Sequence, residues 1–240
     1  LDTSNIRNTS FWRGLAQLPC LTRLCIANLK GVASQLLRTG FPAHMAVLHL
    51  QRSYAEPALP PLPPSLSRLR VLSTEGLCRF PASAGLRDLL LSFIRQRLVC
   101  PAKASAMTQL TYLWLSSVPL KELPAPLVGL PALKVLGLTY AQLRGLPEGL
   151  ACVGALESLE LAGNRLQCVA AVLGGGAASH LKDLNLEENP ELAVGNAGLE
   201  VLRSLAALTC LGLHGAAQGV VQFVAGSSAV LRRALEAVPT

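Results

Sequence analysis

The sequence has few aromatic and few charged side chains. Aromatic residues make up 4% of its 240 residues and charged residues 15%, whereas about a quarter of the residues in an average protein are charged. A chain with so little charge and 51% hydrophobic residues is not expected to contain a long disordered acidic or basic tail. With so few aromatic residues, leucine must carry most of the core packing, as expected when one small unit is stacked repeatedly.

Cysteine pairs and long apolar runs are also missing. The seven cysteines are an odd number, follow no framework and include no C-x-x-C pair, so we predict a reducing compartment, the cytoplasm. No run of 18 apolar residues is present, and a helix that spans a membrane needs about that length. We therefore expect no membrane span.

Motifs of known catalytic sites are absent as well. The sequence contains no G-x-S-x-G, H-E-x-x-H or Walker motif, so we predict that the chain is not an enzyme. Neither His44 nor His49 has a cysteine or carboxylate nearby in sequence, which argues against a zinc site. We predict no cofactor and no metal, although a group of carboxylates between Glu157 and Glu188 leaves calcium or a basic peptide as a less favoured alternative.

The most regular feature of the sequence is a repeat. Between Leu110 and Gly163, two segments of 23 residues stand in tandem and a third begins, each opening with L-x-x-L-x-L. Leu-Pro follows at the same offset in the first two, at 123–124 and 146–147. A period of 20 to 50 residues indicates a repeat architecture. Nine such openings occur, at intervals of 20 to 27 residues, starting at Leu21, Met45, Leu66, Leu86, Leu110, Leu133, Leu156, Leu181 and Leu208.

This pattern resembles the leucine-rich repeat superfamily, in its intracellular form. Each L-x-L is a short strand whose alternate side chains are buried, and stacking the units sets these strands side by side. The resemblance implies an α/β leucine-rich repeat solenoid curved like a horseshoe. A parallel β-sheet would line its concave face, and short 3-10, extended or helical returns its convex face. The longest unit leaves room for a helix at Gly198–Leu205.

The repeats predict a single leucine-rich repeat domain over residues 1–240. Residues 1–20 would be a partial repeat and residues 228–238 a helix that closes the last open face. Because the chain starts inside a repeat, we expect a piece of a longer chain. The resemblance also assigns Asn164 and Asn189 to the asparagine that holds the turn after each strand. Secreted members of the family usually have cysteine-clustered ends, which this sequence lacks.

The charges are uneven along the chain. Residues 1–109 contain 13 Lys and Arg against 4 Asp and Glu, whereas residues 110–240 contain 8 against 10. A basic half suggests an acidic partner surface, nucleic acid or an anionic membrane. A solvated basic face is the more common explanation, and we regard nucleic acid as an unlikely partner.

The repeat register predicts which side chains face outward from the sheet. They should change from basic through aromatic to acidic along the chain. Trp114 lies between Leu113 and Leu115, so it should point outward, beside Tyr112 and Phe93. Outward aromatic residues are typical of binding hot spots, although they could instead only pack on each other across the strands. The predicted partner-binding residues are Arg68, Arg70, Arg87, Phe93, Tyr112, Trp114, Lys134, Tyr140, Glu157, Glu160, Asp183 and Glu187.

These features together predict a non-catalytic protein–protein interaction module. It would bind a partner protein on its concave face, as a monomer or as part of a larger chain. The resemblance implies three alternatives: the substrate receptor of a ubiquitin ligase, the sensor part of a NOD-like receptor, or an axonemal or cytoskeletal scaffold. The last would place the protein at the cytoskeleton or the cilium axoneme. A regulator similar to GTPase activators is a second alternative.

Overall fold

The computed structural model describes residues 9–27, 40–52, 59, 61–73, 77, 79–120, 122–127, 129–146, 155–173 and 180–213. These belong to two compact units, Leu1–Pro119 (unit 1) and Leu120–Thr240 (unit 2), and each is described by itself. The predicted closing helix at 228–238 lies outside the described residues, as do residues 1–8 of the predicted partial repeat.

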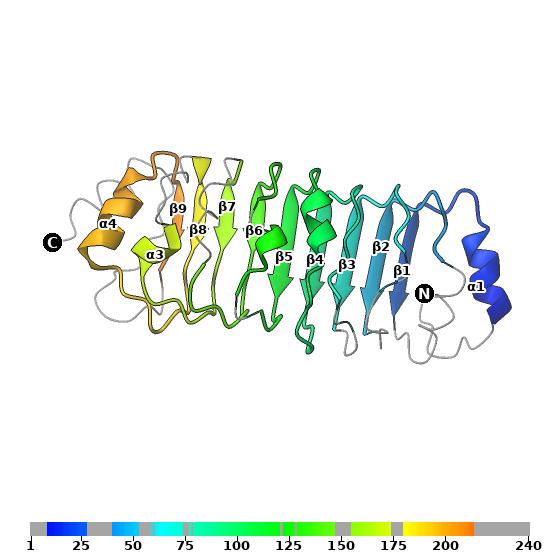
Figure 1. Cartoon of the computed structure of the whole chain (residues 1–240), viewed down its shortest axis with the longest axis horizontal. Helices are drawn as coiled ribbons and strands as arrows, with labels where there is room; N and C mark the ends of the chain where they lie inside the picture. The colour runs from blue at the N-terminus through cyan, green and yellow to red at the C-terminus, as the bar shows by residue number, and fades with distance from the viewer. Residues whose placement is uncertain are drawn as a thin grey trace. The chain divides into compact units, whose positions relative to one another are not determined.

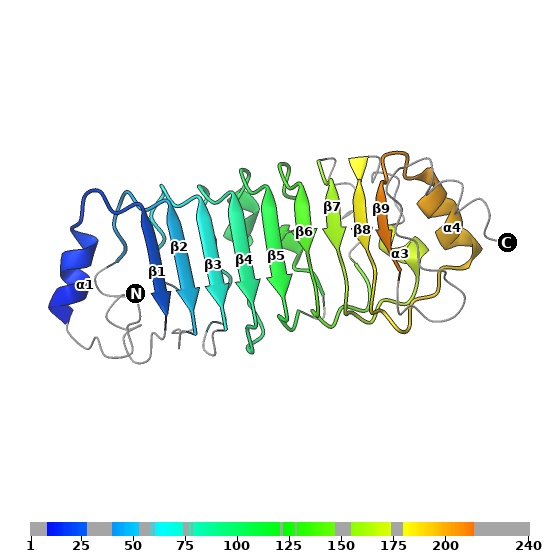
Figure 2. The same cartoon turned by 180° about the vertical axis from the view of Figure 1, so that it is seen from behind.

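Unit 1 contains five strands of five residues each, and neighbours in sequence pair in parallel (Figures 1 and 2). One α-helix precedes them, and a 3-10 helix lies in the last return. The elements are α1 (Thr9–Ala16), β1 (Arg23–Ala27), β2 (Val47–Gln51), β3 (Arg68–Leu72), β4 (Asp88–Ser92), η1 (Ala102–Ala106) and β5 (Tyr112–Ser116).

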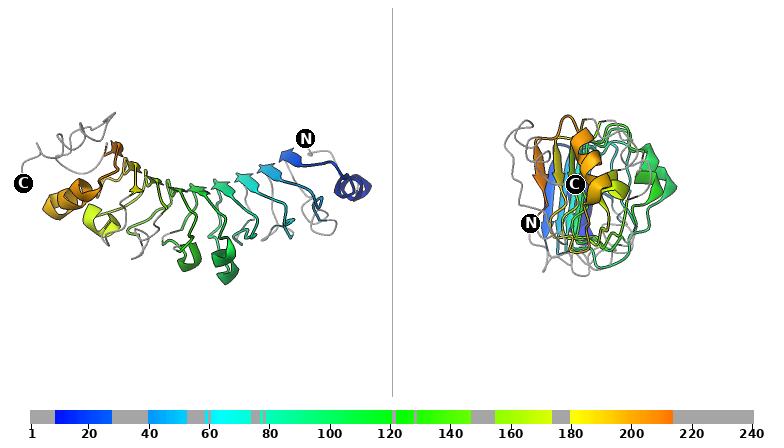
Figure 3. Two further views of the ribbon diagram at one scale, coloured as in Figure 1. Left: turned by 90° about the horizontal axis from the view of Figure 1, so that it is seen from above. Right: turned by 90° about the vertical axis from the view of Figure 1, so that its left-hand side faces the viewer.

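Unit 2 contains four strands of three residues each, which also pair in parallel in sequence order. Its returns include two α-helices and a 3-10 helix. The elements are η2 (Ala125–Leu127), β6 (Val135–Gly137), β7 (Ser158–Glu160), α3 (Val169–Leu173), β8 (Asp183–Asn185), α4 (Gly195–Ser204) and β9 (Cys210–Gly212). Within each unit, Figure 3 shows the strands on one side and the 3-10 and helical returns on the other.

The strands confirm the predicted register. Each of the nine begins two residues after a predicted repeat start; β5, for example, begins at Tyr112, after Leu110. The leucines of the motif form the core, and Leu110, Leu113 and Leu115 are completely buried. The helix predicted at Gly198–Leu205 is present as α4, although it begins three residues earlier. The fold is the parallel-sheet leucine-rich repeat fold that the sequence predicted.

A residue in the left-handed backbone conformation follows strands in both units. It stands seven residues after the repeat start, and the φ angles of Arg52, Phe93 and Tyr140 are 49°, 54° and 53°. Its N–H still bonds to the next repeat: Phe93 N donates to Ser116 O at 2.9 Å, and Tyr140 N to Ala162 O at 3.0 Å. Because non-glycine residues rarely adopt this conformation, these positions mark where the strand is turned into the return segment.

The turn asparagines predicted in unit 2 are both buried and hydrogen-bonded. Asn164 Oδ1 accepts from the backbone N–H groups of Ala141 (3.0 Å) and Leu143 (3.1 Å). Its Nδ2 donates to the carbonyl oxygens of Leu138 (2.7 Å) and Leu161 (2.8 Å). The side chain therefore ties the turn of its own repeat to that of the preceding one, which confirms the prediction.

Asn189 makes corresponding contacts one repeat later. Its Nδ2 donates to the carbonyl of Leu161 at 3.0 Å, and its Oδ1 accepts from Leu166 N at 3.2 Å. In the β4 and β5 repeats of unit 1 the equivalent positions are apolar: Ile94 and Val118 are completely buried there. In the β6 repeat of unit 2 this position is the buried Ala141, so the residue that fills it varies from repeat to repeat.

Candidate functional site

The exposed sheet face of unit 1 consists of the strand side chains that alternate with the buried leucines. The strand register aligns them in three rows across β1 to β5, and the first two rows carry the predicted binding residues of these strands. The first row contains Arg23, Val47, Arg68, Asp88 and Tyr112, and the second contains Cys25, His49, Arg70, Leu90 and Trp114.

Tyr112 and Trp114 form an aromatic stack at the end of the two rows. Their ring centroids are 5.9 Å apart and their planes differ by 12°, and both residues are partly exposed. Leu90 is the register partner of Trp114 on β4 and is also partly exposed. Leu90 was not among the predicted binding residues, although the buried Leu89 and Leu91 on either side require it to point outward.

Two arginines on β3 have different environments. Arg68 Nε lies 2.6 Å from Asp88 Oδ2. Arg70 is exposed and is the register partner of His49 on β2; no carboxylate in the described part of the chain pairs with it. Burial, and then the positive charge of Arg70, lower the pKa of His49, so His49 is neutral near pH 7.

Two polar atoms on this face are buried and unpaired. They are Nε2 of His49 and Oδ1 of Asp88, for which the described residues provide no hydrogen-bond partner. Asp88 is also the one carboxylate among the described residues of unit 1. The face therefore carries positive charge that it does not neutralise itself.

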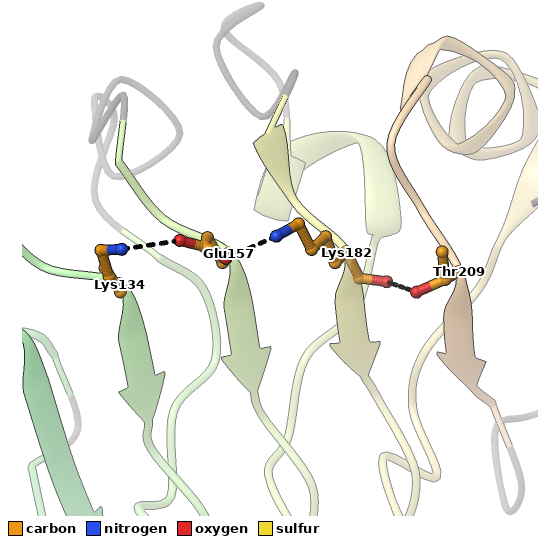
Figure 4. A network of polar contacts seen from close by, with 4 residues as sticks. All are labelled: Lys134, Glu157, Lys182 and Thr209. Atoms are coloured by element: carbon orange, nitrogen blue, oxygen red, sulfur yellow. Dashed lines mark hydrogen bonds and ion pairs between the residues drawn. The ribbon is translucent and has the colours of Figure 1, made fainter.

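In unit 2, charged residues that precede the strands bind one another (Figure 4). Lys134 Nζ lies 3.1 Å from Glu157 Oε1, and Lys182 Nζ lies 2.7 Å from Glu157 Oε2. Thr209 Oγ1 continues the series by donating to the Lys182 carbonyl at 3.1 Å. The hydrogen bond from Lys182, followed by that from Lys134, lowers the pKa of Glu157. The predicted binding residues Lys134 and Glu157 are thus engaged with each other.

The exposed sheet face of unit 2 carries carboxylates. Burial, together with the negative charges of Asp183 and Glu187, raises the pKa of Glu160, and a hydrogen bond from Asn185 opposes this shift. Within the described ranges, no three His, Cys, Asp or Glu side chains are arranged to hold a metal ion.

Tyr140 lies apart from the Tyr112–Trp114 stack in the chain and has its own partners in unit 2. Its hydroxyl donates to Glu188 Oε2 at 2.7 Å, and this bond and the charge of Glu188 raise the pKa of Tyr140. The ring occupies the space above Gly163, where a Cβ atom would lie only 2.3 Å from Tyr140 Cδ1. The aromatic centre predicted from the sequence is therefore represented in unit 1 by Tyr112, Trp114 and the 59% exposed Phe93.

The twelve predicted binding residues fall into three groups by position. The first group consists of strand residues of the exposed sheet faces: Arg68, Arg70, Tyr112, Trp114, Glu160 and Asp183. The second consists of residues that directly precede a strand: Arg87, Lys134 and Glu157. The third consists of residues that follow a strand: Phe93, Tyr140 and Glu187.

Two further observations concern the environment of the protein. Four cysteines in the described ranges, Cys20, Cys100, Cys168 and Cys210, have free thiols. Among the described helices, none has the length and hydropathy that crossing a bilayer requires.

Comparisons with known proteins support the fold. No protein-family model matches the chain, and no curated protein matches it. Three solved structures are similar to it. A chain from the Toll–Spatzle complex of Drosophila has a TM-score of 0.57 and 19% identity, a leucine-rich repeat protein of Leptospira interrogans 0.57 and 21%, and an internalin of Listeria monocytogenes 0.58 and 17%.

These similarities cover most of this chain but only part of the other proteins. They include 88%, 87% and 87% of this chain, and 26%, 58% and 59% of the respective neighbours. The chain thus spans less than two thirds of the length of these neighbours. At identities of 17% to 21%, the likeness concerns the leucine-rich repeat fold alone.

Proposed function

We propose that this chain is a non-catalytic protein–protein interaction module that binds a partner protein on the exposed sheet face. The observation that carries the proposal is the Tyr112–Trp114 stack, which stands outward on a strand whose leucines are completely buried. The leucines already form the core below it. A bound partner protein would therefore bury the part of these rings that remains exposed.

The composition of the face supports a protein partner. Tyr, Trp and Arg are the residues most enriched at the energetic centres of protein interfaces. All three types occur here, with Arg70 on β3 and Tyr112 and Trp114 on β5, separated by the single strand β4. Stacking limits the motion of both rings before binding, which reduces the entropy lost on association. One of the similar structures is itself a complex, Toll–Spatzle.

Several cellular roles are compatible with such a surface. A cytoplasmic substrate receptor, a sensor and an axonemal or cytoskeletal scaffold would all use it to hold a protein, whereas a GTPase-activator-like regulator would use it to act on one. Affinity capture with the chain, followed by mass spectrometry, distinguishes these roles by the identity of the bound proteins.

The test is the affinity of the captured partner for a Trp114→Ala variant, measured by calorimetry. Loss of a hot-spot tryptophan costs at least about 2 kcal/mol, so binding should weaken about 30-fold or more. Val99→Ala is the matched control, because Val99 is a 64% exposed apolar residue in a return segment. Unchanged affinity in the Trp114 variant, or loss of its circular dichroism spectrum, would contradict the proposal.

A further inference from the structure

We infer that the exposed sheet face of unit 1 binds an acidic peptide segment of its partner, with a carboxylate on Arg70 and an apolar side chain on the Tyr112–Trp114 stack. This inference rests on the proposed function and adds the chemistry of the partner. It depends on the availability of Arg70, on the spacing between Arg70 and Trp114, and on the apolar surface between them.

Arg70 is the cation of the two rows best placed to take a carboxylate. Arg68, on the same strand, already binds Asp88 through Nε, and Asp88 is the one carboxylate in the described part of unit 1. Arg70 is exposed and has no carboxylate partner among the described residues. Its guanidinium group can bind a carboxylate through two parallel hydrogen bonds.

His49 provides a second polar contact beside Arg70. The two residues are register partners on β2 and β3, and Nε2 of His49 is buried without a hydrogen-bond partner. Leaving a buried polar group unpaired is unfavourable, so a ligand that reaches this atom gains a hydrogen bond. Because burial and Arg70 lower its pKa, His49 contributes as a neutral group and not as a second positive charge.

The sheet geometry sets the spacing between the two anchors. Arg70 and Trp114 occupy the same row on β3 and β5, with Leu90 of β4 between them. Neighbouring strands are about 4.8 Å apart, so the two positions are separated by roughly 10 Å. A peptide in the polyproline II conformation advances about 3.1 Å per residue and has three residues per turn, so its side chains three positions apart point the same way and are about 9 Å apart. A peptide that crosses the strands therefore reaches both anchors when its acidic and apolar residues are three positions apart.

The surface between the anchors favours a peptide over a nucleic acid. Leu90 lies between Arg70 and Trp114 and is partly exposed. A nucleic acid would bring a charged phosphate with each nucleotide, and Leu90 and the neutral His49 offer those phosphates no cation. A peptide with one acidic residue and one apolar residue matches the order in which this face presents the Arg70 cation, the apolar Leu90 and the aromatic stack.

Selection from a random dodecapeptide library on the immobilised full chain tests this inference. The selected pool should be enriched in Asp or Glu, with Trp, Phe or Leu three positions away. A synthetic peptide from the pool should bind the Arg70→Glu variant at least about tenfold more weakly, because the reversal places two carboxylates together. Arg70→Gln should fall between that variant and the original chain.

Lys103→Glu is the control for net charge. Lys103 is exposed on η1, in a return segment, and its reversal changes the total charge by the same amount as Arg70→Glu. It should alter the affinity by less than about twofold, since the charge of an exposed side chain away from the site is screened.

Four outcomes would overturn the inference, and they separate it from the proposed function. Peptides without acidic enrichment that still depend on Trp114 would refute the acidic partner and leave the interaction module standing. Peptides that bind the Arg70→Glu and Trp114→Ala variants as tightly as the original chain would refute both, as would a pool with no enrichment. Stronger binding of single-stranded poly(U) RNA than of the peptides, lost in Arg70→Glu, would identify a nucleic-acid surface instead.

Discussion

Unit 1 and unit 2 use the same repeat but end their strands differently. Strands have five residues in unit 1 and three in unit 2. In two repeats of unit 2, the buried asparagines Asn164 and Asn189 bind the backbone of the turn, whereas Ala141 of unit 2 and Ile94 and Val118 of unit 1 place an apolar side chain at the equivalent position. The difference teaches that the leucines establish the register of a repeat, while the turn residue is where one repeat can vary from another.

The surfaces of the two units differ in the same way. In unit 2, Glu157 is held by Lys134 and Lys182, and Tyr140 is held by Glu188. In unit 1, Arg70 lacks a carboxylate partner within the described ranges. Groups that bind one another serve the structure of a surface, and groups that do not are available to a partner. Substitutions in the turns and on the surfaces of the two units test this contrast.

The largest effect should follow from Asn164→Val. The substitution removes four hydrogen bonds to buried backbone groups, and a buried group left unpaired costs roughly 1–3 kcal/mol. We expect a loss of about 4 kcal/mol in the free energy of unfolding, allowing for partial relaxation. Ile94→Val, at the equivalent position in unit 1, should cost only about 1 kcal/mol. Urea unfolding followed by circular dichroism measures both, and equal losses would remove the distinction between the turns.

A smaller effect is expected from Gly163→Ala. Gly163 has a φ of 71°, and a left-handed backbone costs a residue with a Cβ roughly 1–2 kcal/mol. The methyl group would also displace the ring of Tyr140. Ser73, at the equivalent position in unit 1, has a φ of 55°. Ser73→Gly should change the stability by less than about 1 kcal/mol, because relief of strain is offset by backbone entropy. The same urea titration applies, and a neutral Gly163→Ala would contradict the expectation.

Arg68→Ala should destabilise unit 1 slightly. It removes the partner of Asp88, whose side chain is 18% exposed and whose Oδ1 is already unpaired. We expect a loss of about 1 kcal/mol, at the upper end for a partly exposed ion pair. Lys182→Ala in unit 2 should cause no measurable loss, since Lys134 still binds Glu157. A larger loss from Lys182→Ala than from Arg68→Ala would reverse the comparison.

The smallest effect is spectroscopic and concerns Tyr140. Because the hydrogen bond to Glu188 raises the pKa of Tyr140, the stability from this bond is present below the unfolded pKa of about 10. It is lost as the pH rises through the higher folded pKa. Glu188→Gln should therefore lower the pKa of Tyr140, which ultraviolet titration of tyrosine ionisation measures. Identical titration curves for the two proteins would show that the bond is absent in solution.

Local patterns in the sequence predicted the repeat register and the buried leucines, and the resemblance to leucine-rich repeats implied the turn asparagines. These features depend on alternation within a strand or on one residue type at one offset. The pairing of Tyr140 with Glu188 was not predictable, because it requires a left-handed turn at residue 140 and a glycine at 163 that leaves room for the ring. The ion pairs of Glu157 with Lys134 and Lys182 were likewise not predictable, because they depend on how three repeats align.

Hydroxyl-radical footprinting most directly tests the claim that unit 1 provides the binding surface. Oxidation of Trp114 and Tyr112 would be measured by mass spectrometry with and without a bound peptide from the selected pool, with Tyr140 of unit 2 as the internal reference. We predict that the peptide slows oxidation of Trp114 and Tyr112 several-fold and leaves Tyr140 unchanged. Unchanged oxidation of Trp114 at saturating peptide, or protection of Tyr140 alone, would contradict the claim.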